Sequence, residues 1–319
     1  MVTGGAGFIG SHVVDRLIKE KPSNLVVVDN FFLGKESNLT ESKANYSKLK
    51  ILHQDAKNRK TMKQIMADER IQVVFNLAVT PLPASLTRPR WAYEENMAIL
   101  LTVLELIREK TFDTLIHFSS SEVYGTSAYA PMDETHPLNG TTPYAVSKAA
   151  GDNMVLSYCR LFGIDASIVR PFNNYGPRQN EKSYAGVIPL TINRILKGES
   201  PIIYGDGKQT RDYIYVTDTT DAVVKIYNYP RSRSEVINIG TGMETNINIL
   251  VQLLANHLGW DKPIIYEAPR PGDVRRHIAS IFLAKDLIDF YPEVSISEGL
   301  KKTAEWYKQS ATDWKHSQI

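Results

Sequence analysis

The sequence lacks the features that define several large classes of protein. Its 319 residues include a single cysteine, Cys159, which excludes an internal disulfide and leaves a structural zinc site without a cysteine cluster. No apolar run approaches the roughly 20 residues that a membrane span needs, and the first residues carry no secretion-signal pattern. Metal-ligand spacings are absent as well. We therefore expect a cytoplasmic protein with no metal ion and no membrane partner.

An excess of one charge is also missing. Lys and Arg number 37 against 35 Asp and Glu, and the two signs are interspersed along the chain. A basic stripe that could follow nucleic acid is therefore not expected. With 43% hydrophobic residues, the chain has ample material for one large or two ordinary domains. A small molecule, rather than nucleic acid, is the expected ligand.

Apolar runs alternate with helical patterns through the first 171 residues. We expect helices near 11–19, 61–68, 91–109 and 144–161, and strands near 25–29, 50–53, 73–78, 114–119 and 166–171. Only Met1-Val2-Thr3 precede the first glycines, so the first strand is expected to be short. Such alternation is typical of parallel strands joined by crossover helices, and it predicts a Rossmann-type, doubly wound α/β sheet.

Beyond Pro171 the alternation breaks down, because loops rich in Asn, Gly and Pro interrupt shorter elements. This change indicates a smaller α/β domain that is interleaved with the first. Segments 213–216 and 236–239 look like strands that return to the first domain. We expect a nucleotide-binding domain over 1–172 and 213–241, and a ligand-binding domain over 173–212 and 242–319.

A glycine-rich loop precedes the first helix. Thr3 to Gly10 reads TGGAGFIG and satisfies G-x-G-x-x-G directly after a strand. Glycines let such a backbone approach a pyrophosphate, which the free amides and positive end of the helix attract. Asp29 ends the next strand, where a carboxylate binds the adenosine ribose and repels a 2′-phosphate. The pattern predicts NAD rather than NADP; a plain glycine turn with a capping Asp does not account for the strand-helix-strand frame.

Tyr144 and Lys148 lie four residues apart, on one face of a predicted helix. The Lys148 charge, together with a positive nicotinamide, would lower the phenol pKa so that Tyr144 could take a hydroxyl proton while hydride leaves the same carbon. Alone, this spacing is common on amphipathic surface helices. Its position after a nucleotide loop makes the chemical interpretation the better one.

A serine-rich turn with one carboxylate, Ser119-Ser120-Ser121-Glu122, follows the strand near 114–119. Parallel strands present ligands at this end, so Ser120 could bond the same hydroxyl as Tyr144. A carboxylate in such a cleft is expected to have either a hydrogen-bond or ion-pair partner or a catalytic role. Glu122 is therefore a candidate catalytic base, with a structural hydrogen bond to a neighbouring helix as the alternative.

Together these motifs resemble the extended short-chain dehydrogenase/reductase family, specifically its nucleotide-sugar epimerases, dehydratases and decarboxylases. The resemblance covers essentially the whole chain. Besides the segments above, it rests on Asp29-Asn30, His53-Gln54-Asp55, Asn76-Leu77-Ala78, Arg170 to Gln179, Tyr204 to Tyr213, Asn238 to Gly242 and Arg270 to Asp273.

The resemblance implies an NAD-dependent enzyme with a UDP-sugar substrate, and it assigns roles residue by residue. NAD would contact Gly4, Gly7, Phe8, Ile9, Gly10, Asp29, Asn30, Asp55, Ala56, Leu77, Ala78, Ser119, Tyr144, Lys148 and Phe172. The substrate would contact Thr80, Ser120, Asn173, Val187, Tyr204, Arg211, Arg270 and Asp273, with the arginines suited to the diphosphate. The catalytic set would be Tyr144, Lys148, Ser120, Ser121 and Glu122. A homodimer through a four-helix bundle of the helices near 91–109 and 144–161 is also implied.

The reaction type depends on the Ser121-Glu122 pair. In similar enzymes every reaction starts with oxidation at the sugar C4, and a 4-epimerase needs no further carboxylate. A 4,6-dehydratase must also remove the C5 proton and expel the C6 hydroxyl, and Glu122 stands where similar dehydratases keep their base. Their neighbouring acid is usually Asp, whereas Ser121 resembles the UDP-glucuronate decarboxylases. In a dehydration, the leaving C6 hydroxyl would thus have to be protonated by Glu122 itself or by a relayed proton.

Segments 76–81, 170–181 and 185–189 are similar to short UDP-N-acetylglucosamine 4,6-dehydratases, including a giant-virus branch with 5-epimerase activity. The resemblance thus predicts dehydration of UDP-N-acetylglucosamine to a 4-keto-6-deoxy sugar, with C5 inverted if reprotonation comes from the opposite face. UDP-sugar 4-epimerase and UDP-glucuronate decarboxylase stay as alternatives. A non-catalytic NAD-binding regulator is a remote one, because the Tyr-Lys pair is intact. For a viral chain the setting would be the host cytoplasm.

Overall fold

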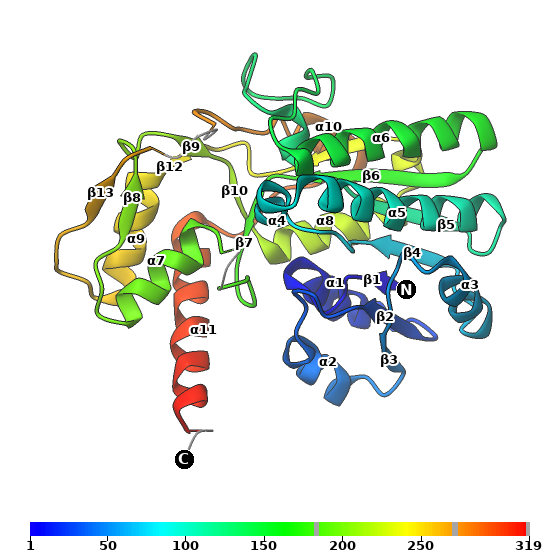
Figure 1. Cartoon of the computed structure of the whole chain (residues 1–319), viewed down its shortest axis with the longest axis horizontal. Coiled ribbons are helices and arrows are strands. Elements are labelled where there is room, and N and C mark those ends of the chain that lie inside the picture. The colour runs from blue at the N-terminus through cyan, green and yellow to red at the C-terminus, as the bar shows by residue number, and fades with distance from the viewer. Residues whose placement is uncertain (182–184, 270–273, 317–319) are drawn as a thin grey trace.

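Seven parallel strands form the main sheet of the computed structural model, which describes residues 1–181, 185–269 and 274–316 (Figure 1). The strand order is β3-β2-β1-β4-β5-β6-β11. The bounds are β1 Val2–Thr3, β2 Leu25–Asp29, β3 Leu49–His53, β4 Val73–Asn76, β5 Thr114–Phe118, β6 Asp165–Pro171 and β11 Val236–Ile239. The order reverses between β1 and β4, and open parallel sheets bind ligands outside the carboxyl ends of their strands at such a point.

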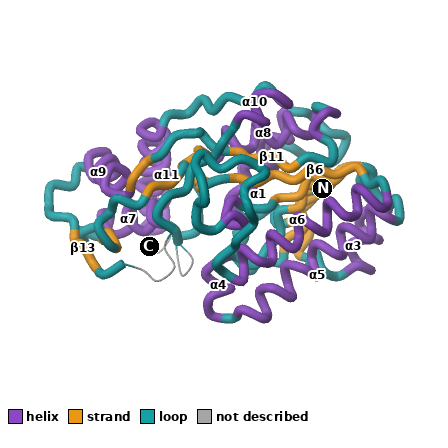
Figure 2. Tube along the Cα trace, turned by 90° about the horizontal axis from the view of Figure 1, so that it is seen from above, coloured by secondary structure: helices purple, strands orange, loops and turns teal. Residues whose placement is uncertain are grey.

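Helices cover both faces of this sheet, which gives a three-layer arrangement (Figure 2). One face carries α1 Phe8–Lys19, α8 Val216–Asn228 and α10 Phe282–Ile288, and the other carries α3 Arg59–Asp68, α5 Pro89–Arg108 and α6 Pro143–Phe162. Side chains alternate between the two cores along a strand: Val27 packs into the first, whereas Val26 and Val28 pack into the second. Burial on both faces explains why β2 is apolar throughout rather than alternating.

Three two-stranded sheets and three helices form a smaller unit beside the main sheet (Figure 1). The pairs are β7 Asn173–Tyr175 with β10 Tyr213–Tyr215, β8 Ile202–Tyr204 with β13 Ile265–Glu267, and β9 Thr210–Arg211 with β12 Thr245–Asn246. The helices α7 Val187–Leu196, α9 Ile247–Leu258 and α11 Ile296–His316 share one apolar core with these strands. Short helices α2 Thr40–Asn45 and α4 Leu82–Thr87 lie in connections.

The predicted fold class is confirmed, and most predicted elements of the first 171 residues form within a few residues of their expected bounds. The expected strand 213–216 forms as β10, but it pairs with β7 and not with the main sheet. The expected strand 236–239 joins the main sheet beside β6. Within the described part of the chain, no helix has both the length and the apolar character needed to cross a membrane.

A buried ion pair ties the long helix α6 to strand β6. Arg170 Nε donates to Asp152 Oδ2 at 2.8 Å, and both side chains are at most 3% exposed. The same guanidinium donates to the hydroxyl of Tyr124 at 2.9 Å, and that hydroxyl donates to Asn238 Oδ1 at 2.7 Å. Burial raises the pKa of Asp152, and the charge of Arg170 opposes that shift. The network thus fixes α6, β6 and β11 relative to one another.

We expect Asp152→Ala to lower the free energy of unfolding by about 3–5 kcal/mol, because Arg170 would keep a buried charge without a counter-ion. The exposed pair of Arg231 and Asp286, 3.5 Å apart, offers the control. At this exposed pair, Asp286→Ala should lower the free energy of unfolding by less than about 1 kcal/mol. Urea unfolding followed by circular dichroism measures both variants, and equal small losses would contradict the assignment.

Candidate active site

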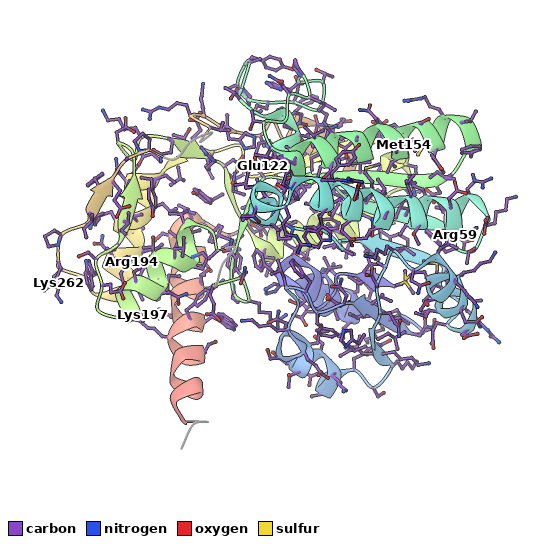
Figure 3. All side chains as sticks on the ribbon, viewed as in Figure 1. Arg59, Glu122, Met154, Arg194, Lys197 and Lys262 are labelled. Carbon is purple, nitrogen blue, oxygen red and sulfur yellow. The ribbon has the colours of Figure 1, made fainter. Side chains whose placement is uncertain are left out.

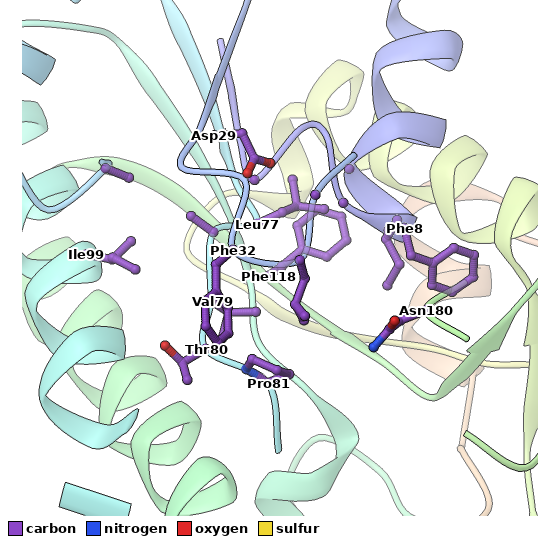
Figure 4. Close-up of a pocket in the computed structure, with 18 of the residues that line it drawn as sticks. Phe8, Asp29, Phe32, Leu77, Val79, Thr80, Pro81, Ile99, Phe118 and Asn180 are labelled. Carbon is purple, nitrogen blue, oxygen red and sulfur yellow. The ribbon is translucent and has the colours of Figure 1, made fainter. Parts of the chain in front are cut away.

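A cavity of about 410 Å³ lies at the carboxyl ends of the main-sheet strands (Figure 4). Its walls come from the loop after β1, the ends of β2 and β4, and the segments that follow β5 and β6. All residues predicted to contact NAD line this cavity, and so do Thr80 and Ser120. The cavity therefore sits where the reversal of strand order requires a ligand site.

The glycine loop packs so closely on its neighbours that side chains are excluded at two positions. A Cβ on Gly4 would lie 2.8 Å from the backbone nitrogen of Ala78, and Gly4 has a positive φ of 68°. A Cβ on Gly10 would lie 2.1 Å from the carbonyl oxygen of Gly4. Helix α1 follows at once with Gly7 as its N-cap and no side chain capping it. Its first amides and positive end therefore suit the pyrophosphate of a dinucleotide.

Asp29 ends β2 inside the cavity and is held by the backbone. Its two carboxylate oxygens accept from Ala6 N at 2.9 Å and from Phe31 N at 2.8 Å. Burial raises the pKa of this carboxyl group, and the two hydrogen bonds oppose that shift. Each oxygen has a further lone pair, so ribose hydroxyls could donate to it as well. Gly34 keeps the approach open, because a Cβ there would lie 2.8 Å from Asp29 Oδ1.

The serine-glutamate turn forms a short 3₁₀ helix, η2 Ser121–Tyr124, directly after β5. Ser120 begins this helix, since its Oγ accepts from Glu122 N at 3.2 Å. The Ser121 side chain is buried, and its backbone carbonyl faces His277 Nε2 at 3.1 Å. Figure 3 shows Glu122 near the middle of the molecule, between the main sheet and the smaller unit. Neither Ser121 nor Glu122 is among the residues that line the 410 Å³ cavity.

Tyr144 lies in the first turn of α6, where Thr142 Oγ1 accepts from Ala145 N at 3.1 Å and Pro143 occupies the first helical position. Burial raises the pKa of the Tyr144 phenol to about 12. A hydrogen bond with Ser120 lowers that pKa, whereas the nearby charge of Glu122 raises it. The phenol, the Ser120 hydroxyl and the Glu122 carboxylate are therefore close enough to influence one another.

Lys148 lies one turn after Tyr144 on α6 and lines the same cavity. Its Nζ donates to the carbonyl oxygen of Phe118 at 2.6 Å, at the end of β5. Burial lowers the pKa of Lys148 to about 8, against the charge of Asp152. Burial is the largest influence on the Tyr144 pKa, and the lowering of that pKa by Lys148 together with a positive nicotinamide stays a prediction.

The residues predicted for the substrate are more scattered. Asn173, Val187, Tyr204 and Arg211 belong to β7, α7, β8 and β9 of the smaller unit, and none of them lines the cavity. Arg211 Nη1 donates to the carbonyl oxygens of Thr210 and Val274, at 2.8 and 2.5 Å. The remaining predicted residues, Arg270 and Asp273, lie outside the described residues.

Sequence reasoning missed Asn96, a buried polar side chain on α5. Its Oδ1 accepts from Thr80 N at 2.7 Å, and its Nδ2 donates to Ser147 Oγ at 3.0 Å. Ser147 Oγ in turn donates to the carbonyl of Tyr144 at 2.7 Å. Asn96 thus links the cavity residue Thr80 to helix α6. Its only sequence signal is an amide on the otherwise apolar face of a helix. Across 1–181, 185–269 and 274–316, no three side chains gather as they would around a metal ion.

We expect Gly10→Ala to weaken NAD binding by at least about 10-fold, because a methyl group 2.1 Å from Gly4 O forces the loop off its position. Gly163 is the matched control, since its φ of 63° is strained for alanine but nothing lies within 4 Å of its Cβ position. Gly163→Ala should cost about 1–2 kcal/mol of stability and leave NAD affinity intact. Calorimetric titration with NAD measures both, and equal affinities would refute this packing argument.

The lowered pKa of Lys148 predicts that the free energy of unfolding depends on pH. Its pKa falls from 10.5 to about 8 on folding, so between these values the unfolded chain binds more protons than the folded one. The stability of the wild type relative to Lys148→Met should therefore rise with pH across this window and stay level below it. Urea midpoints over the same window give the difference, and a flat difference would show that the ammonium is not desolvated.

Comparison with known proteins agrees with this geometry. A model of the NAD dependent epimerase/dehydratase family matches residues 1–240. The UDP-glucose 4-epimerase of Thermotoga maritima, solved with UDP-glucose, is 35% identical, with a TM-score of 0.91 over 97% of this chain and 98% of that chain. The UDP-N-acetylglucosamine 4-epimerase of Methanobrevibacter ruminantium is 35% identical, with a TM-score of 0.90 over 97% of both chains.

A third structure adds the cofactor. The dTDP-glucose 4,6-dehydratase of Streptomyces venezuelae, solved with NAD bound, is 28% identical, with a TM-score of 0.90 over 98% of this chain and 97% of that chain. The chain therefore belongs to the NAD-dependent epimerase/dehydratase family, and it is an NAD-dependent enzyme that acts on a nucleotide sugar.

Proposed function

We propose that this enzyme is a 4,6-dehydratase of UDP-N-acetylglucosamine, with a 4-keto-6-deoxy sugar as product. One observation carries the proposal: the Glu122 carboxylate shares a neighbourhood with the Tyr144 phenol and the Ser120 hydroxyl at the end of β5. The reaction is that of the similar Streptomyces dehydratase, and the sugar is that of the similar Methanobrevibacter epimerase.

We assign NAD to the 410 Å³ cavity. We place the pyrophosphate at the glycine loop, the adenosine ribose at Asp29 and Asn30, and the adenine at Asp55 and Ala56. Leu77, Ala78, Ser119 and Phe172 would then line the path towards Tyr144. Bound NAD supplies the hydride acceptor for the sugar C4 and the donor for the final reduction.

Proton transfer at C4 falls to Tyr144, with Ser120 orienting the hydroxyl. A phenol with a pKa of about 12 is a poor proton acceptor near neutral pH, so this role needs added positive charge. Lys148 lies one helical turn away, and the oxidised nicotinamide carries the second charge. We therefore assign Lys148 two tasks: it holds the end of β5 through Phe118 O, and it favours the ionised phenol.

The C5 and C6 steps fall to Glu122. Its carboxylate takes the C5 proton, the C5–C6 double bond forms, and the C6–O bond breaks. The Ser121 side chain is buried, and a serine hydroxyl is too weak an acid to protonate the departing hydroxyl. Glu122 therefore returns the proton it has taken to the C6 oxygen, and water leaves. Return of the hydride to C6 and addition of a solvent proton at C5 would complete the 4-keto-6-deoxy sugar. We assign the diphosphate to Arg211 and Arg270, and the uridine ribose to Asp273. We assign the sugar to Thr80, Asn173, Val187 and Tyr204.

A 4-epimerase is the second candidate, because two of the compared structures carry that activity in their names. It would use Tyr144, Ser120 and NAD in the same way and would leave Glu122 without a chemical task. The proton at C5 therefore separates the two candidates.

We also propose a homodimer through α5 and α6. These helices pack side by side on one face of the sheet, and several of their apolar side chains are exposed. They are Tyr93, Leu101, Val146, Leu161 and Phe162. A second copy of the same pair would cover them as a four-helix bundle.

The decisive experiment incubates the enzyme with UDP-N-acetylglucosamine in deuterium oxide and follows the sugar by NMR and mass spectrometry. A 4-keto-6-deoxy product with deuterium at C5 is expected, and the ring couplings then report whether C5 has inverted. Formation of UDP-N-acetylgalactosamine alone would establish the epimerase instead.

We expect Glu122→Gln to slow dehydration by about 10²- to 10⁴-fold, while NADH still forms from C4 oxidation. Glu134 provides a matched carboxylate outside the proposed site. Its Oε1 accepts from Asn238 N at 2.8 Å. Glu134→Gln keeps that acceptor and should leave dehydration nearly unchanged. Full dehydration by Glu122→Gln would remove Glu122 from the mechanism.

A further inference from the structure

His277 contacts the catalytic turn from a segment that lies 155 residues beyond Glu122 in the chain. Its Nε2 lies 3.1 Å from the carbonyl oxygen of Ser121, the residue directly before Glu122. Because a carbonyl oxygen can only accept, Nε2 must carry the proton and donate it. The imidazole is 2% exposed, and its ring lies 5.0 Å, between centroids, from that of Phe172. The His277 imidazole is therefore held both by packing against Phe172 and by its hydrogen bond to Ser121 O.

The segment that carries His277 also belongs to the substrate side of the site. Its backbone runs beside β9: Thr210 N donates to Arg275 O at 3.0 Å, and Asp212 N donates to His277 O at 2.9 Å. Arg211 lies between these two bonds. Burial first, and then the charge of Arg211, lower the pKa of His277 to about 4, so the ring is neutral near pH 7. One short path of contacts thus leads from Arg211 through His277 to the turn.

The other side of the same turn is held by Ser120. Its Oγ accepts from Glu122 N, so the backbone around Glu122 is bonded from two directions. A turn held at both sides fixes where its carboxylate points. His277 Nε2 donates to the carbonyl oxygen of Ser121, directly before Glu122, so its side chain acts through the position of Glu122.

We propose that His277 is a positioning residue for the C5 step: by holding the Ser121 carbonyl, it aims the Glu122 carboxylate at the sugar. This inference rests on the proposed dehydratase function. The same segment bonds the backbone on both sides of Arg211, which is assigned to the diphosphate, so His277 lies between the proposed diphosphate site and the proposed base.

The test compares His277→Leu with His277→Gln, in which the amide nitrogen can occupy the place of Nε2. Two steps are measured on each: NADH formation by absorbance, which reports C4 oxidation, and deuterium incorporation at C5. We expect His277→Leu to lower the rate at C5 by about 10- to 100-fold relative to C4 oxidation, because the turn loses its donor. The Gln variant should restore most of that ratio.

His12 offers a matched control. Its Nε2 lies 3.0 Å from the carbonyl oxygen of Pro177, and burial lowers its pKa to about 4, but it sits on α1 away from the turn. His12→Leu should leave the ratio of the two steps unchanged. Thermal unfolding of every variant with NAD present measures the structural effect separately. If His277→Leu does not fold, His277→Asn repeats the test, because the shorter amide is polar but cannot reach Ser121.

Equal losses at C4 and C5 in His277→Leu would overturn the inference, as would failure of Gln to restore the ratio. These results differ from failure of the proposed function itself. If the wild-type enzyme forms NADH but incorporates no deuterium at C5, the dehydratase assignment falls, and the role of His277 falls with it.

Discussion

Parallel pairing of the short strand β1 with both β2 and β4 is the constraint on which the site depends. Val2 aligns with Val27 on one side and with Phe75 on the other, so the loops after all three strands reach the same edge of the sheet. Thr3 Oγ1 fixes this register further by donating to Asn76 Oδ1 at 2.7 Å. The glycine loop, Asp29 and the Leu77-Ala78 segment can surround one ligand only because these strands run in the same direction.

The part of the site that could be predicted is the part that local sequence determines. The glycine loop, Asp29 and the Tyr144-Lys148 pair each follow from a strand end or from a helical spacing. Asn96 and His277 could not be found in this way, because their roles come from hydrogen bonds to residues far away in the chain. For the same reason β10 was expected in the wrong sheet. Its Tyr-Ile-Tyr pattern predicts a strand but does not specify its neighbour.

Burial gives Tyr144 and Lys148 properties that their spacing does not reveal. Tyr144 and Lys148 are both enclosed, so the phenol holds its proton more tightly and the ammonium more weakly than either would in water. The sequence predicts that Lys148, together with a positive nicotinamide, lowers the pKa of the phenol. It does not reveal that desolvation is the largest influence on the pKa of each group. Enclosing a phenol and an ammonium in this way costs stability, and the buried ion pair of Asp152 and Arg170 supports the helix that carries them.

The passage from β6 to β7 restricts how the two units can move. β6 ends at Pro171 and β7 begins at Asn173, so only Phe172 separates a strand of the main sheet from a strand of the smaller unit. Phe172 N bonds Ile239 O, and Asn173 N bonds Asp212 O. A hinge at this point would break both ladders, which argues against closure of the units as rigid bodies. Substrate entry and product release would then depend on the connecting loops.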